Sequence, residues 1–332
     1  MPAVMSRRRF ITFVAAAAGL PLLLKAGGSQ AKPVRWDGTA LGAPASIQLY
    51  HADEAQAHAA IAAGLGELKR LEAIFSVYRA DSSISKLNRE GMLENAPHDF
   101  IAMTTRALSL AKISDGVYDP TIQPLWQTYF RHFTAGNPDP AGPAPRDLAA
   151  ALALVDWRAV EVDAANKRIS FARPGMGLTL NSGAQGYITD RVADVLRAHG
   201  FDRMLVDMGE PRALSTKPDG SAWRVGIANP ADPSRAIVTL DIVDKCVSTS
   251  GGYGTLFDAK GSFTHLIDTR TGHTAPALLG VSVVADTGAV ADGLSTAMLM
   301  APVERRQAIL KAAGGQKAIY VTPEGVISTV TA

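Results

Sequence analysis

Apolar residues recur at helical spacing in several stretches of the chain. The clearest series is Ile61, Leu65, Leu68, Leu71 and Phe75, whose intervals of three and four residues predict an amphipathic helix with one buried face. The same criterion predicts further helices at 100–111, at 188–196 with an end at Gly200, at 288–300 and at 304–313.

Short runs of alternating or continuous apolar residues between these helices predict strands. Two of them, at 159–162 and 169–171, flank a turn at Ala165 and Asn166 and predict a hairpin. Because helices and strands come in clusters and do not alternate, we expect the α+β class with largely antiparallel sheets, and not a doubly wound parallel sheet. The other expected strands lie at 46–50, 203–208, 223–228, 236–242, 245–250 and 281–286, with a closing hairpin across Pro323 to Gly325.

A proline-rich stretch interrupts this pattern. The segment TAGNPDPAGPAPRD, residues 134–147, contains four prolines and two glycines, which oppose regular secondary structure. We expect a surface insertion within a single domain over 32–332, although a domain boundary is the alternative. A chain of this length can bury a core of its own.

The first 31 residues have the order of an export signal. A basic segment precedes the apolar run from Ile11 to Leu24, which is shorter than the roughly 20 residues of a membrane-spanning helix. The sequence SRRRFI around Arg7 and Arg8 is similar to a twin-arginine signal, and a general secretion signal is the alternative. We therefore expect removal of residues 1–31, a periplasmic protein and no membrane span after cleavage.

Charge and cysteine content argue against two features, a nucleic-acid-binding surface and an internal disulfide. The signal contains four of the 33 basic residues and none of the 31 acidic ones, so the mature chain is slightly acidic. A nucleic-acid-binding surface is therefore not expected. The single cysteine, Cys246, cannot form an internal disulfide, so the core must provide the stability.

The helix at 288–300 contains two polar side chains among small and apolar residues. Asp292 and Thr296 are separated by one helical turn and share a face. A buried carboxylate is unfavourable unless its charge is compensated, and a hard cation would do so. Helix capping or solvent exposure is the ordinary alternative.

Several polar clusters follow the expected elements in an order that is similar to a known family. They include YRADSSISKLN, GVYDPTIQPLW, LNSGAQGYITD and VDMGE, and the most specific ones are STSGGY, THLIDTRTG and ADGLST. Together they resemble the FAD:protein FMN transferase family from about Trp36 to the end of the chain. The resemblance implies a T-fold-like architecture of two closely packed sheet-plus-helix halves.

The resemblance also implies the ligands of the site. Mg²⁺ would be held by Asp292, Thr296 and the main-chain carbonyl of Ser182, which leaves positions open for phosphate oxygens. FAD would be the donor substrate. Its expected contacts are Leu41, Tyr78, Val117, Tyr118, Asp119, Thr179, Gln185, Thr249, Ser250, Gly251 and Leu266.

The implied reaction moves FMN from FAD to a Ser or Thr hydroxyl of an acceptor flavoprotein and releases AMP. His265 is the expected general base, with a histidine that only hydrogen-bonds its loop as the alternative. Asp268 is the next base to consider. A metal-dependent FAD pyrophosphatase would use the same ligands with water in place of the acceptor.

The chain departs from the family pattern at four positions. Thr179 replaces an Asp, Gln185 replaces a Lys or Glu, Leu41 replaces a Met and Ala43 replaces a Thr. These changes keep a non-catalytic flavin-binding assembly protein among the alternatives. The variant LNSGAQGYITD with VDMGE downstream is most similar to the branch that serves nitrous oxide reductase maturation. That branch implies a membrane-bound acceptor with a periplasmic FMN-binding domain.

Overall fold

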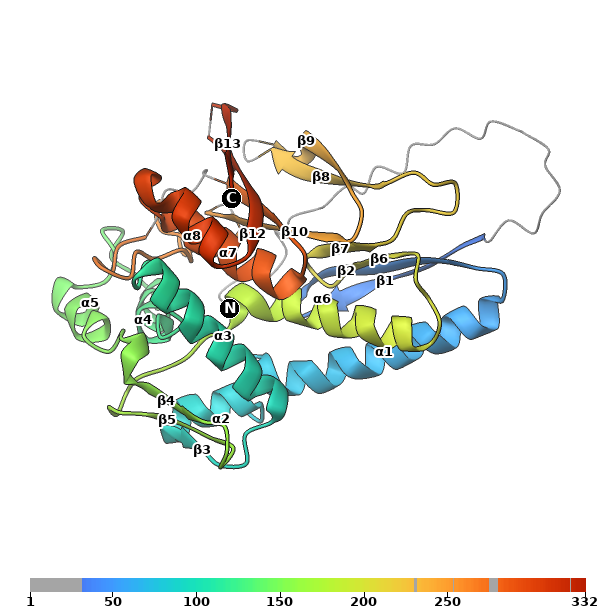
Figure 1. Ribbon diagram of the computed structural model, residues 1–332. Helices are drawn as coiled ribbons and strands as arrows, with labels where there is room; N and C mark the ends of the chain where they lie inside the picture. Colours follow the sequence, from blue (N-terminus) through green and yellow to red (C-terminus); the bar gives the residue numbers. More distant parts are fainter. Residues whose placement is uncertain (1–31, 230–231, 253, 275–279, 323) are drawn as a thin grey trace.

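The computed structural model describes residues 32–332 except 230–231, 253, 275–279 and 323 (Figure 1). The predicted export signal and Pro323 of the expected closing turn lie outside the described residues. Within the described ranges, no helix combines the length and apolar character needed to cross a membrane.

One sheet of eight antiparallel strands dominates the fold (Figure 1). It places the first strand pair beside strands from the middle and the end of the chain, so one continuous sheet joins the two expected halves. The α+β class is confirmed. In spatial order the strands are β1 (Lys32–Ala40), β2 (Ala43–His51), β6 (Met204–Asp207), β7 (Pro211–Leu214), β10 (Lys245–Gly251), β11 (Gly280–Ala285), β12 (Gly315–Val321) and β13 (Ile327–Thr331).

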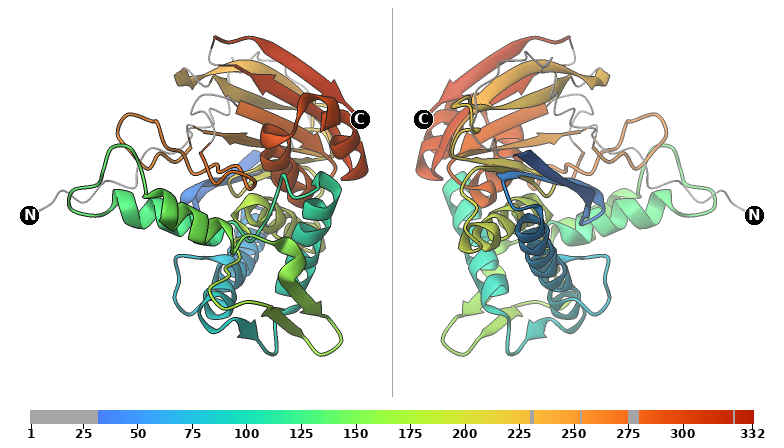
Figure 2. Two further views of the ribbon diagram at one scale, coloured as in Figure 1. Left: turned by 90° about the vertical axis from the view of Figure 1, so that its left-hand side faces the viewer. Right: turned by 90° about the vertical axis from the view of Figure 1, so that its right-hand side faces the viewer.

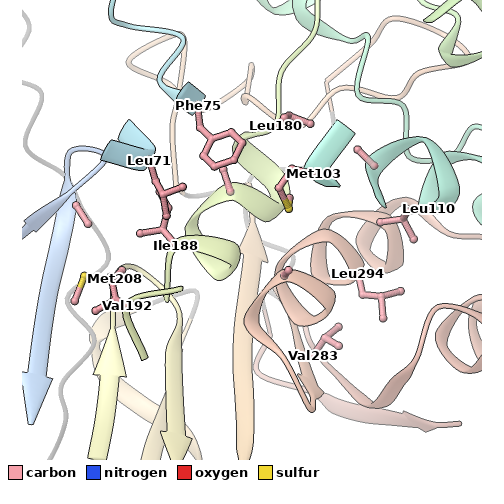
Figure 3. Close-up of a cluster of buried hydrophobic side chains, with 14 of the residues drawn as sticks. Leu71, Phe75, Met103, Leu110, Leu180, Ile188, Val192, Met208, Val283 and Leu294 are labelled. Atoms are coloured by element: carbon pink, nitrogen blue, oxygen red, sulfur yellow. The ribbon is translucent and has the colours of Figure 1, made fainter. Parts of the chain in front are cut away.

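Three helices connect this sheet to the rest of the molecule. Helix α1 (Glu54–Phe75) lies along α6 (Asn181–Ala198), and α7 (Gly288–Met300) packs on β10 and β11. Figure 3 shows Leu71 and Phe75 of α1 in one buried cluster with Ile188 and Val192 of α6. The predicted apolar face of α1 is therefore the face that meets the core.

A second group of elements lies at the end of the molecule opposite β13 (Figures 1 and 2). A three-stranded antiparallel sheet has the order β3 (Met92–Leu93), β5 (Arg168–Phe171), β4 (Val160–Asp163), as the predicted 159–171 hairpin requires. The helices of this group are α2 (Ser83–Glu90) and α3 (His98–Ser114), whereas α4 (Gln123–Phe133) and α5 (Pro145–Leu152) project at one side of the molecule. Of these four helices, only α3 was predicted from the sequence.

The remaining strand pair packs on the large sheet, where Trp223 and Val225 share a buried cluster with Ala213 and Val247. Strands β8 (Trp223–Asn229) and β9 (Asp232–Ile242) form a two-stranded sheet, and the buried Trp223 ring contacts Tyr50 of β2 with ring centroids 5.9 Å apart. The expected closing hairpin is formed by β12 and β13.

Two predicted boundaries are wrong. The proline-rich loop ends at Ala144, because Pro145 starts α5; proline has no N–H to lose in the first helical turn. The predicted helix 304–313 begins as a 3₁₀ turn at Val303–Arg305 and continues as α8 (Arg306–Ala312).

Candidate functional site

Two glycines bring α6 and α7 into backbone contact. A Cβ on Gly186 would lie 2.1 Å from the carbonyl oxygen of Gly288, and a Cβ on Gly288 would lie 2.3 Å from that of Gly186. Any larger residue at either position would force the helices apart. The sequence GAQG at the start of α6 is thus required for the approach of the two helices that contain the predicted metal ligands.

The first turn of α6 is broken beside this contact. Ser182 has non-helical backbone angles, and Gly183 has φ of 137°, a value that favours glycine. The Ser182 carbonyl therefore leaves the helical ladder and accepts a 3.2 Å hydrogen bond from the Tyr118 hydroxyl. A Cβ on Gly293 would lie 3.8 Å from this oxygen, so the carbonyl faces α7 next to Asp292.

Asp292 is almost fully buried, with 5% of its surface exposed. Its Oδ2 accepts a 3.0 Å hydrogen bond from the Gly186 N–H. Burial raises the pKa of Asp292 to about 7, although N–H groups of the glycine-rich turn work in the opposite direction. The carboxylate is therefore held in a place that disfavours its charge.

Hydroxyl groups of β10 and α7 form a hydrogen-bonded network on the helix that contains Asp292. The Ser250 hydroxyl lies 3.0 Å from the Thr296 hydroxyl and 2.7 Å from that of Ser295, which donates to the Asp292 carbonyl oxygen at 2.8 Å. The predicted metal ligand Thr296 thus belongs to a network of oxygen atoms, the ligand type that Mg²⁺ prefers.

These groups form part of the wall of a cavity of about 320 Å³. Apart from Asp268, every predicted site residue belongs to this wall. Tyr78 lies at the cavity with 64% of its surface exposed, so its ring is not part of the hydrophobic core. The predicted residues that the cavity brings together are Leu41, Tyr78, Val117, Tyr118, Asp119, Thr179, Ser182, Gln185, Thr249, Ser250, Gly251, His265, Leu266, Asp292 and Thr296.

His265 is oriented by its own loop. Its Nδ1 lies 3.1 Å from the Thr255 carbonyl oxygen, which can only accept, so the ring proton is on Nδ1 and the lone pair is on Nε2. Burial lowers the pKa of His265 below its ordinary value. A neutral imidazole with a lone pair at the cavity wall is suited to accept a proton.

Asp268 occupies a different environment. Its carboxylate forms an ion pair with Arg270 at 2.8 Å and accepts the Arg270 N–H, while its main chain closes the DTRTG turn with Gly272. Burial alone would raise the pKa of Asp268, but Arg270 outweighs it and keeps the pKa below its usual range. Asp268 stabilises the turn beside His265. It is not one of the described residues that form the cavity wall.

The wall residue Asp119 also has internal partners. It accepts hydrogen bonds from the N–H and hydroxyl of Thr121 at 2.8 and 2.6 Å and from the Trp157 N–H at 3.0 Å. Burial raises its pKa. Asp119 thus shapes the loop that carries Val117 and Tyr118 into the cavity.

The sequence analysis missed one wall residue with unusual chemistry. Glu210 is 6% exposed, and its Oε2 has no hydrogen-bond partner among the described residues. Burial, followed by the charge of Asp292, raises its pKa well above the ordinary value. The VDMGE cluster contained this residue, but its burial depends on β7 pairing with β10, which no local pattern reveals.

Charge at the cavity is unbalanced. Of the described residues that form its wall, none is Lys or Arg, whereas Asp119, Glu210 and Asp292 are carboxylates. Within the same described part of the chain, no group of three His, Cys, Asp or Glu residues could hold a metal ion alone. A cation here would need hydroxyl, carbonyl and substrate oxygens as further ligands.

A family model described as the ApbE family matches residues 41–320. The chain belongs to this family. Curated relatives named FAD:protein FMN transferase include one from Treponema pallidum, 30% identical over 81% of this chain and 79% of the relative, and one from Klebsiella pneumoniae, 29% identical over 85% and 87%. The flavinyl transferase ApbE from Pseudomonas stutzeri has a similar structure, with a TM-score of 0.74, 28% identity and coverage of 91% of this chain and 95% of that one.

These matches confirm the family resemblance and the assignment as an enzyme. An ApbE protein from Thermotoga maritima shares the fold with a TM-score of 0.79 at 22% identity over 90% of this chain and 97% of that one. The assignment to the nitrous oxide reductase branch stays a prediction.

Proposed function

We propose that this ApbE-family enzyme transfers FMN from FAD to a Ser or Thr hydroxyl of an acceptor flavoprotein, with Mg²⁺ as cofactor and AMP as the second product. One observation carries the proposal: a single cavity wall contains Asp292, Thr296, the Ser182 carbonyl and the Nε2 of His265. The relatives named FAD:protein FMN transferase support it, because the chain covers most of their length.

The donor set of the cavity fits a hard cation. Asp292, Thr296 and the Ser182 carbonyl all offer oxygen atoms, and the described wall contains no Lys or Arg to offset a pyrophosphate. An anionic dinucleotide would therefore find no positive side chain in the described wall, and the ionised form of Asp292 would repel it. When bound, Mg²⁺ supplies that charge and acts as a Lewis acid on the phosphate oxygens.

The residues of the chain provide the remaining chemistry. His265 accepts the proton of the acceptor hydroxyl at Nε2, whose lone pair the Thr255 carbonyl keeps free. The acceptor oxygen forms a bond to the flavin-side phosphorus, the pyrophosphate P–O bond breaks, and AMP leaves. Thr249, Ser250 and Gly251 at the end of β10 offer hydroxyl and N–H groups to the phosphates.

The place of action follows from the N-terminal sequence. Residues 6–24 support export in a folded state, because paired arginines precede a short apolar run and the buried Cys246 needs no partner. We therefore place the enzyme in the periplasm and its acceptor at the membrane, with an exposed FMN-binding domain. The branch serving nitrous oxide reductase maturation fits both features.

Product analysis tests this function. The purified enzyme is incubated with FAD, Mg²⁺ and an acceptor domain, and nucleotides are separated by chromatography. We expect AMP to appear in step with the loss of FAD, without an equal amount of free FMN. Equal amounts of free FMN and AMP would indicate the pyrophosphatase, and bound FAD without AMP would indicate a flavin-binding assembly protein.

A further inference from the structure

Glu210 lies on the tight turn between β6 and β7. Asp207 accepts the Gly209 N–H at 2.9 Å, and Gly209 has φ of 111°, so a left-handed residue directs the chain into Glu210. A Cβ on Gly209 would lie 2.5 Å from the Gln185 side-chain nitrogen. The turn is thus packed against α6 and holds the Glu210 side chain in one place.

The side chain is buried without a cation. Its nearest charged groups are the carboxylates of Asp292 and Asp207, which both raise its pKa, while the Ser248 hydroxyl and the Thr249 N–H have the opposite effect. Arg212, two residues further on, forms its ion pair with Asp190 at 2.5 Å. No positive side chain of the described cavity wall faces Glu210.

Such an arrangement costs free energy unless something occupies the space beside it. A buried polar atom is almost always hydrogen-bonded, and Oε2 of Glu210 has no such partner in the described part of the chain. Glu210 and Asp292 belong to the wall of one cavity, and a divalent cation there would compensate both charges together.

We propose that Glu210 is an acidic determinant of the magnesium site, where its unpartnered Oε2 adds a second carboxylate to that of Asp292. The inference rests on the magnesium site of the proposed function. It assigns a role to a residue outside the predicted ligand set of Ser182, Asp292 and Thr296. Glu210 increases cation affinity. Its negative charge, together with that of Asp292, compensates the two positive charges of Mg²⁺ at a described wall that has no Lys or Arg.

Calorimetric titration of Mg²⁺ into the purified mature enzyme, in the presence of FAD, tests the inference. Glu210→Gln keeps the shape and the hydrogen-bond acceptor but removes the charge. We expect its Mg²⁺ affinity to fall by about tenfold or more, with an unchanged or higher melting temperature. Glu210→Asp, which restores a charge on a shorter side chain, should bind Mg²⁺ more tightly than the Gln variant.

Two reference variants make the result specific. Asp207→Asn removes a neighbouring carboxylate that lies outside the described cavity wall, and we expect its Mg²⁺ affinity to stay near that of the wild type. If Asp207→Asn and Glu210→Gln lost Mg²⁺ affinity equally, long-range charge alone would explain the loss, and the inference would be wrong. Asp292→Ala tests whether the measured Mg²⁺ binding occurs at the proposed site.

The outcomes separate this inference from the proposed function. If Asp292→Ala loses Mg²⁺ while Glu210→Gln binds it like the wild type, Glu210 has no such role and the magnesium site stands. If the wild type binds no Mg²⁺, both are wrong. Should Glu210→Gln not fold, Glu210→Asp decides: weaker binding than the wild type supports the inference, and unchanged binding contradicts it.

Discussion

The N–H of Gly186 on α6 donates a 3.0 Å hydrogen bond to Oδ2 of Asp292 on α7. This bond joins two motifs of the family resemblance, LNSGAQGYITD and ADGLST, which are far apart in sequence. It orients the carboxylate of a residue that forms part of the cavity wall. The relationship explains why one helix needs glycine where the other needs an acid.

Removal of the Asp292 carboxylate should abolish cation binding. Asp292→Ala takes away the only full charge among Asp292, Thr296 and the Ser182 carbonyl, so we expect Mg²⁺ affinity to fall by more than about tenfold and raised Mg²⁺ to restore transfer only in part. Calorimetry in the presence of FAD measures this. Unchanged Mg²⁺ affinity would show that Asp292 is not a metal ligand and that α7 has only a structural role.

The contact between Gly186 and Gly288 predicts a stability effect. Gly186→Ala would place its Cβ 2.1 Å from the Gly288 carbonyl oxygen. We expect a loss of about 1–3 kcal/mol in the free energy of unfolding, because two backbones must move. Gly66→Ala is the matched control: nothing lies within 4 Å of its Cβ in α1, and it should stabilise by about 0.5–1 kcal/mol. Denaturant unfolding of both variants would show opposite signs, and equal stabilities would refute the close contact.

Asp292 also predicts a pH dependence of the metal-free enzyme. Its folded-state pKa is raised from the ordinary 3.8 to about 7, so the folded chain holds a proton that the unfolded chain loses. As the pH rises from 4 to 7, the free energy of unfolding of the wild type should therefore fall relative to that of Asp292→Asn, by up to about 1.4 kcal/mol per pH unit. Above this range the difference should stay constant. A difference that stays constant over this range would contradict the raised pKa.

Replacement of His265 should affect the reaction and spare the fold. For His265→Ala we expect the transfer rate to fall on the order of 10² to 10⁴ with nearly unchanged FAD affinity and melting temperature, since a base acts mainly in the transition state. In the wild type the transfer rate should fall as acidification protonates His265. Because burial lowers the pKa of His265, this fall should be centred below pH 6.5.

Asp268→Asn provides the comparison for His265. The ion pair with Arg270 and the turn it closes predict a lower melting temperature and a smaller loss of rate than in His265→Ala. If His265→Ala transferred FMN at the wild-type rate and Asp268→Asn did not, the base would be Asp268.

The N-terminal arginines predict the export route. Replacement of Arg7 and Arg8 by Lys should leave the precursor in the cytoplasm, because the twin-arginine pathway requires this pair. Fractionation of cells that produce the full chain would show it. Continued export would indicate the general secretory pathway instead.

Helix α1 and the helix α7 were predictable because their signals are local. The spacing of Ile61, Leu68 and Leu71 is a property of one segment, and so is the pair Asp292 and Thr296. Helix α4 was not predictable in this way. Its Trp126 and Tyr129 rings pack against Phe257, with centroids 5.8 and 5.6 Å apart, and that partner is far away in sequence.

The same distinction applies to the cavity. Its motifs could be recognised, but the turn from β6 to β7 reaches the cavity only through sheet pairing between distant strands. Glu210 was therefore missed. Asp268 was considered as the next base after His265, because sequence proximity to His265 does not show that Arg270 holds its carboxylate.

The intact mass of an acceptor domain tests the central claim most directly. The acceptor is incubated with the enzyme and FAD, with and without Mg²⁺, beside an acceptor whose hydroxyl residue is replaced by Ala or Val. The account predicts a mass gain of one FMN group only when FAD, Mg²⁺ and the hydroxyl are all present. Consumption of FAD with no gain in acceptor mass would contradict it.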